Sequence, residues 1–194
     1  MPYFKVNDQD FFFLHIPKTG GKMLEKVFWE FGLSSGHDVL SSKPSAFSFA
    51  VIRNPLDRLI SSFFYLKDGG CCGMDVDDAL KYDITDNDFT PWVKMLRDNP
   101  EYYFQQQHLR PMAKQIGSLV FIDHFILFEN LEVETKYMYK TFTGKDLEEL
   151  PIINASKHDH YETYYTKETK KMASEVYQRD TQLYEILRGK HETN

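Results

Sequence analysis

The first half of this chain contains short apolar runs, each of which ends abruptly at a polar or turn-forming residue. Residues 11–16 are too apolar and too few to be anything but a buried strand, and Pro17 ends the run because proline has no backbone donor for a sheet. The pair Gly20-Gly21 marks a tight turn. Apolar residues then recur at helical spacing over 23–31. The pattern predicts a strand, a glycine-containing loop that carries Lys18, and a helix, which is an arrangement suited to a phosphate-like anion.

A second stretch repeats this order. Residues 46–52 predict another buried strand, which runs directly into Arg53. Asn54 is a good N-cap and Pro55 a good first residue for the helix that follows, and Ser61 lies about one and a half turns into it. Ligands of open α/β sheets bind at the carboxyl ends of the strands, so this stretch predicts a second anion site.

The remaining pattern predicts an α/β protein with one domain over residues 1–194. Residues 1–10 are a polar lead-in, and residues 119–128 predict one or two strands. Helices are expected near 75–82, 90–96, 102–116, 129–143 and 166–189, the last with Thr166 as its N-cap.

Composition narrows the class of protein. Hydrophobic residues make up 42% of the chain, as in a globular protein, and the net charge of −6 argues against a general binder of nucleic acids or membranes. No apolar run approaches the roughly 20 residues of a membrane span. Cys71 and Cys72 are adjacent and form no disulfide framework, so a reducing, cytoplasmic compartment is expected.

Residues 68–88 are rich in acids and glycine but follow no EF-hand pattern. We expect a solvated loop with a short helix there, and no metal site.

A nucleotide kinase with a degenerate P-loop is one interpretation of the glycine loop. Aligning Gly21-Lys22 with the Gly-Lys pair of a P-loop puts Ile16 at the first glycine and Met23 at the magnesium-binding hydroxyl, and both are wrong for that motif. Asp123, after an apolar run, is the one acid that resembles the magnesium-holding aspartate of such enzymes.

Residues 13–21 and 49–61 closely resemble the two cofactor motifs of the carbohydrate sulfotransferases, the group of heparan 2-O- and chondroitin sulfotransferases and their bacterial or viral relatives. The resemblance covers residues 11–187, and its further segments are 107–111, 122–131, 150–156, 161–166 and 176–180.

This resemblance implies a three-layer, P-loop-like fold with a mainly parallel central sheet flanked by helices. It implies transfer of the sulfuryl group of 3′-phosphoadenosine 5′-phosphosulfate (PAPS) to a hydroxyl without a metal, which releases adenosine 3′,5′-bisphosphate. The residues that match the family's contacts to the 5′-phosphosulfate are Lys18, Thr19, Gly20, Gly21 and Lys22. Those for the 3′-phosphate are Arg53 and Ser61, and Ser156 and Lys157 are further candidates for cofactor contact.

Lys18 is the candidate for stabilising charge on the leaving phosphate. His37 matches the family's catalytic base, with His108 as the alternative, whereas His15 is expected to be structural. Lys22 and Met23 replace hydroxyl residues of the family motif. A relative that binds nucleotide without turnover, acting as an interaction module, therefore stays open beside the enzyme and the kinase.

The acceptor is expected to be a glycan or a small molecule. The acids of 68–88 suit a neutral or cationic acceptor better than a heavily sulfated glycan. The sequence predicts no nucleic acid partner and no membrane span, and it leaves the oligomeric state open.

Overall fold

The computed structural model describes residues 3–34, 36–37, 39–151 and 158–192. The chain divides into two compact units. The first unit comprises Met1–Arg53, Met112–Ala155 and Tyr184–Asn194, and the second comprises Asn54–Pro111 and Ser156–Leu183. Each unit is described by itself, and the single domain expected from the sequence stays a prediction.

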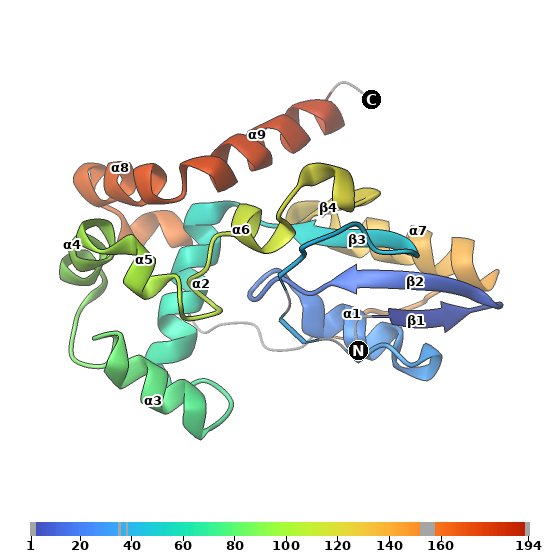
Figure 1. The fold of residues 1–194 in the computed structure, drawn as a ribbon, viewed down its shortest axis with the longest axis horizontal. Helices are drawn as coiled ribbons and strands as arrows, with labels where there is room; N and C mark the ends of the chain where they lie inside the picture. The colour runs from blue at the N-terminus through green and yellow to red at the C-terminus, as the bar shows by residue number, and fades with distance from the viewer. Residues whose placement is uncertain (1–2, 35, 38, 152–157, 193–194) are drawn as a thin grey trace. The chain divides into compact units, whose positions relative to one another are not determined.

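The first unit contains a four-stranded sheet with the order β1-β2-β3-β4 (Figure 1). Its strands are β1 (Tyr3–Val6), β2 (Gln9–Leu14), β3 (Phe47–Ile52) and β4 (His124–Leu127). β1 is antiparallel to β2, whereas β2, β3 and β4 run parallel. The polar lead-in expected at residues 1–10 was therefore wrong. Asn7 and Asp8 both take positive φ values, 47° and 64°, so the first two strands are joined by a two-residue turn of the kind that Asn and Asp tolerate.

Aromatic and aliphatic residues cover one face of this sheet and pack against helices α1 (Gly21–Val27) and α7 (Leu131–Thr143). Phe13 of β2 lies opposite Phe49 of β3, with ring centroids 5.1 Å apart, and both are fully buried. The shorter elements of this unit are η1 (Trp29–Phe31), α6 (Met112–Ile116), η2 (Leu119–Phe121) and η3 (Phe128–Asn130). These features confirm an α/β architecture with a mostly parallel sheet.

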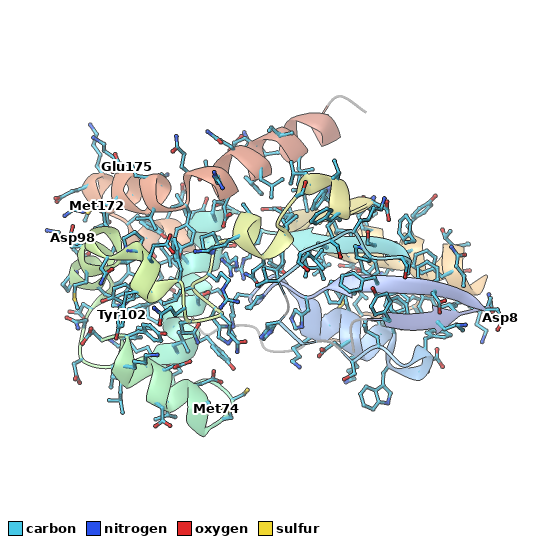
Figure 2. The ribbon with its side chains drawn as sticks, viewed as in Figure 1. Asp8, Met74, Asp98, Tyr102, Met172 and Glu175 are labelled. Carbon is cyan, nitrogen blue, oxygen red and sulfur yellow. The ribbon has the colours of Figure 1, made fainter. Side chains whose placement is uncertain are left out.

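The second unit is helical. Its helices are α2 (Pro55–Lys67), α3 (Gly73–Lys81), α4 (Phe89–Asp98), α5 (Pro100–Tyr103), η4 (Tyr161–Tyr164) and α8 (Lys167–Val176), and α9 (Gln178–Glu192) is shared between the two units. Their core surrounds Phe63 and Trp92, with Tyr102 and Met172, both labelled in Figure 2, also packed in this cluster.

Two predicted helix starts are confirmed. The Asn54 side chain accepts a hydrogen bond from the Leu56 N–H at 3.0 Å, with Pro55 as the first helical residue of α2. Thr166 forms a capping box with Thr169 at the start of α8.

Three expected elements are wrong in extent. The helix expected over 166–189 is interrupted at Tyr177 and forms α8 and α9. The helix expected over 102–116 is instead the end of α5, a series of turns and α6. Within 119–128 only His124–Leu127 is a strand. In the part of the chain that the structure describes, no helix is both long enough and apolar enough to span a bilayer.

Candidate functional site

The loop between β2 and α1 has an unusual backbone. Lys18 adopts a φ of 67° and Gly20 a φ of 86°, both in the left-handed region. Thr19 between them is fully buried, and its hydroxyl donates to the Ile16 carbonyl at 2.8 Å. Left-handed residues in such a loop turn neighbouring N–H groups toward one side, which is the backbone arrangement of anion-binding concavities. The Thr19 side chain therefore holds the loop in shape, and N–H groups are the donors that suit an anion here.

Both glycines of the loop lie so close to other side chains of the protein that a larger residue does not fit at either position. A Cβ on Gly20 would lie 2.5 Å from Leu131 Cδ2 and 3.3 Å from the Phe128 ring. A Cβ on Gly21 would lie 2.1 Å from His15 Cδ2. These distances are far below van der Waals contact, so the loop can approach η3, α7 and His15 only because positions 20 and 21 have no side chain.

Arg53 lies where the sequence predicted it, directly after β3. Its Nη1 donates to the Lys18 carbonyl at 3.0 Å, and its guanidinium carbon lies 4.4 Å from the centroid of the Phe128 ring. Because β2 and β3 are parallel neighbours, the Lys18 loop and Arg53 meet at the carboxyl edge of the sheet. The structure thus joins the Arg53 side chain to the backbone of Lys18, 35 positions away in the sequence.

Lys22 forms an ion pair with Glu25 of the same helix. Its Nζ lies 2.7 Å from Glu25 Oε2, and its side chain is 57% exposed. The other oxygen of the same carboxylate, Oε1, lies 3.6 Å from His15 Nδ1. Glu25 therefore links Lys22 to His15. The spacing of Lys22 and Glu25, three residues apart on a predicted helix, was the sequence signal for this pair.

His37 packs against His15 in the first unit. Their ring centroids are 4.6 Å apart with the planes at 69°, an edge-to-face contact, and His37 is half-buried. His15 itself is 3% exposed and stacks on Phe13. The structure therefore joins the predicted base to the loop through His15, a contact that no sequence pattern indicated.

The other predicted cofactor residues are Ser61, Ser156 and Lys157. Ser61 lies in α2 of the second unit and is 1% exposed. Ser156 and Lys157 lie outside the described residues. Their contributions to cofactor binding stay predictions.

His108, the alternative base, lies in the second unit beside two polar side chains. Its Nε2 is 3.8 Å from Asp75 Oδ1, and its ring centroid is 4.7 Å from that of Tyr65. The Tyr65 hydroxyl donates to Asp75 Oδ2 at 2.8 Å. Burial raises the pKa of Asp75, but hydrogen bonds from the Cys71 N–H and the Tyr65 hydroxyl outweigh it, so the pKa of this carboxyl is below its usual value. Burial and the same carboxylate raise the pKa of Tyr65, so its phenol stays protonated.

Arg58 is a buried charged residue of the second unit. Its side chain is 2% exposed and donates from Nη2 to the carbonyls of His108 and Arg110 at 3.2 and 3.0 Å. Arg58 therefore fixes the chain around His108 within the second unit.

Asp123, the acid that resembled a magnesium ligand, lies at the edge of the sheet opposite the Lys18 loop, where it cannot take that role. It precedes β4, and it accepts from Lys43 Nζ at 2.6 Å and from the Ser48 N–H at 3.0 Å. The Lys43 ammonium, together with Ser48, lowers the pKa of this carboxyl. Because Ser48 is near the amino end of β3, Asp123 lies at the edge opposite the Lys18 loop.

A pocket of about 550 Å³ in the first unit shares Phe128 with the Arg53 stack. Apolar residues line it together with Lys136 and four glutamates, Glu129, Glu132, Glu148 and Glu149. Because its carboxylates outnumber its ammonium groups, this lining is unsuited to a phosphate group.

Comparison with known proteins identifies one family. A family model described as the sulfotransferase family matches residues 34–186, more than half of the chain. The match contains His37, Arg53, Ser61 and His108, whereas the Lys18 loop precedes it. No curated protein and no solved structure matches the chain significantly. Since a single family model spans most of its length, this chain belongs to the sulfotransferase family.

Proposed function

We propose that this protein transfers the sulfuryl group of PAPS to a hydroxyl of an acceptor, in a three-layer, P-loop-like fold. The observation that carries the proposal is the meeting of Lys18 and Arg53 at the carboxyl edge of the sheet, within a chain of the sulfotransferase family. A cofactor with phosphate groups at both ends needs cationic donors and turned backbone N–H groups, and this edge supplies both.

The residues of the loop fit the 5′-phosphosulfate. Lys18 carries the charge, and the backbone N–H groups of Thr19, Gly20 and Gly21 are the candidate donors. Lys22 is a further candidate for contact with the 5′-phosphosulfate, and its Nζ lies 2.7 Å from Glu25 Oε2. The guanidinium fork of Arg53 is the donor for the 3′-phosphate, and Ser61, Ser156 and Lys157 are the further candidates that the resemblance supplies.

In this proposal PAPS supplies the sulfuryl group, and the protein positions the reacting oxygens and stabilises charge. His37 accepts the proton of the attacking acceptor hydroxyl as the bond to sulfur forms. Lys18 stabilises the negative charge that the leaving phosphate gains as its bond to sulfur breaks. His15 packs edge-on against His37 and faces Glu25, which restricts the orientation of the predicted base.

In this proposal the acceptor is a carbohydrate hydroxyl. The protein is proposed to be a soluble enzyme of the cytoplasm. The resemblance to carbohydrate sulfotransferases supports the glycan, and the acidic stretch 68–88 favours a neutral or cationic one. A strong preference for polyanionic acceptors would contradict this part.

The test is a titration of the full-length protein with adenosine 3′,5′-bisphosphate in EDTA, followed by transfer of labelled sulfate from PAPS to a panel of neutral, cationic and polyanionic glycans. We expect micromolar binding without magnesium, competition by PAPS, and label on at least one neutral glycan. Binding of magnesium-ATP without competition by PAPS would replace the proposal with the kinase, against which the position of Asp123 already argues. Tight binding with no turnover on any acceptor would favour the interaction module.

A further inference from the structure

The second unit contains a cluster of two thiols, a carboxylate and an imidazole. These groups are typical metal ligands, whereas the proposed nucleotide site consists of cationic side chains and backbone N–H groups. We propose that Cys71, Cys72, Asp75 and His108 bind a structural zinc ion. The proposal goes beyond sulfuryl transfer and does not depend on it. It also departs from the sequence-based expectation, which placed no metal in the acidic stretch.

Three of the four groups lie close together, and the fourth, His108, lies beside one of them. One ligand atom from each of Cys71, Cys72 and Asp75 lies within 4.8 Å of the others. Cys72 Sγ is 3.6 Å from Asp75 Oδ2, and His108 Nε2 is 3.8 Å from Asp75 Oδ1. Zinc bonds of about 2.0–2.3 Å at tetrahedral angles separate neighbouring ligand atoms by about 3.3–3.8 Å. Cys71, Cys72 and Asp75 are therefore the assembled part of the site, and in this proposal His108, which contacts the other carboxylate oxygen, joins them by rotation of its side chain.

The carboxylate is already oriented by hydrogen bonds of the kind that support metal ligands. Asp75 Oδ2 accepts from the Tyr65 hydroxyl at 2.8 Å and from the Cys71 N–H at 2.9 Å. These two donors hold Oδ2 and turn Oδ1 toward His108. Asp75 is 5% exposed and His108 6% exposed, so the two groups are fixed within the core of this unit.

The turn that presents the thiols is shaped around Asp75. Gly70 has a φ of 61°, and a Cβ on it would lie 2.2 Å from Asp75 Cβ, so only glycine lets the chain close on this residue. Cys71 and Cys72 follow it and are exposed. Met74, the second residue of α3 and labelled in Figure 2, is 74% exposed. An ion can therefore enter from solvent toward a buried carboxylate and imidazole.

The donor set selects the metal. Two thiolates with an imidazole and a carboxylate suit zinc, whereas calcium and magnesium prefer oxygen donors alone. Four protein ligands leave no open position, which is typical of a structural site. The ion would fasten the start of α3 to the segment before α6, with release of the two thiol protons. A zinc-bound His108 cannot accept a proton from an acceptor, so this inference also favours His37 as the base.

The test is a cobalt titration of the full-length protein after it has been stripped with EDTA and reduced. We expect one equivalent of Co²⁺ to give the near-ultraviolet thiolate charge-transfer band and the visible bands of tetrahedral cobalt, both removed by added Zn²⁺. Asp75→Asn and His108→Gln should each weaken Co²⁺ binding at least tenfold, and Cys71→Ser and Cys72→Ser should each diminish the charge-transfer band. Asp77→Asn and His160→Gln are matched controls, because both residues are exposed in the same unit.

The wild-type spectrum is decisive even where a variant fails to fold. Absence of a charge-transfer band in the wild-type protein would overturn the proposal. The proposal would also be overturned if the charge-transfer band of Asp75→Asn and of His108→Gln were as strong as that of the control variants. The metal would then be bound by the exposed thiols alone. As a second measurement, Zn²⁺ should raise the melting temperature of the wild-type protein more than that of Cys72→Ser, and equal shifts would count against the site.

Discussion

The Arg53 guanidinium donates from Nη1 to the backbone carbonyl of Lys18 at 3.0 Å, while its face rests on the Phe128 ring. The residue that follows β3 thus ties down the loop that follows β2. A change at Arg53 will therefore affect both halves of the proposed nucleotide site.

Replacing Arg53 tests this coupling. Arg53→Ala should weaken binding of adenosine 3′,5′-bisphosphate by at least tenfold, about 1.4 kcal/mol, because the charge and the tether to Lys18 are both lost. Arg53→Lys keeps the charge without the planar fork, and we expect an intermediate loss. Isothermal titration calorimetry in EDTA measures both.

Arg97→Ala is the control for the Arg53 variants, because this exposed arginine pairs with its neighbour Asp98 on α4. Its affinity should match that of the wild type. Unchanged binding by Arg53→Ala would remove Arg53 from the nucleotide site.

The base can be identified by a pair of substitutions. His37→Asn should lower turnover with PAPS and an accepted glycan by about 10²–10⁴-fold, the range of a lost general base, with nucleotide affinity nearly unchanged. His108→Asn should instead act through the stability of the second unit. If His108→Asn abolishes turnover in a protein that melts normally while His37→Asn does not, the roles are reversed.

Gly21 should be intolerant of any side chain because of His15. Gly21→Ala puts a Cβ 2.1 Å from His15 Cδ2, and we expect a loss of about 1–3 kcal/mol in the free energy of unfolding. In a His15→Ala background the same change should cost much less, so a double-mutant cycle by chemical denaturation should give a favourable coupling energy.

Gly189→Ala serves as the control for this cycle, since among the described residues no atom outside the helix's own backbone and the two neighbours in the chain lies within 4 Å of a Cβ at that position. It should be neutral or slightly stabilising. Additive effects of Gly21→Ala and His15→Ala would show that their contact does not limit position 21.

The Lys43–Asp123 pair predicts a pH-dependent stability. Because Lys43 lowers the pKa of Asp123, the pair stabilises the fold above the usual aspartate pKa of about 3.9 and loses this contribution as the pH falls through the lowered value. Lys43→Met should cost about 0.2–1 kcal/mol at pH 7, as for a partly exposed ion pair, and less at pH 2.5.

Chemical denaturation at both pH values measures this difference, with Lys145→Met as the exposed-lysine control. An undiminished effect of Lys43→Met in acid would mean that the lysine stabilises the fold by packing and not by its charge on Asp123.

Local sequence was sufficient where short-range rules act. The apolar runs placed β2 and β3 to within about two residues, and Asn54 with Pro55 marked the start of α2, because strand burial and helix capping are decided by neighbouring residues. Predictions from the hydrophobic pattern were wrong where contacts in the core determine the end of a helix. Tyr177 interrupts the final helix although the apolar spacing continues through it, and its hydroxyl donates to the Leu109 carbonyl at 2.7 Å in the core of the second unit.

The sequence by itself determined which residues are candidates for the site. Residue type and position relative to the predicted strands were enough to identify the Lys18 loop, Arg53 and the histidines. Only the tertiary structure decided how they are joined. The contacts of Arg53 with Lys18 and Phe128, and of His37 with His15, form between residues 22 to 75 positions apart. Such contacts are fixed by the parallel pairing of strands and the packing of helices on them, and no local pattern records which distant side chain will occupy the adjacent space.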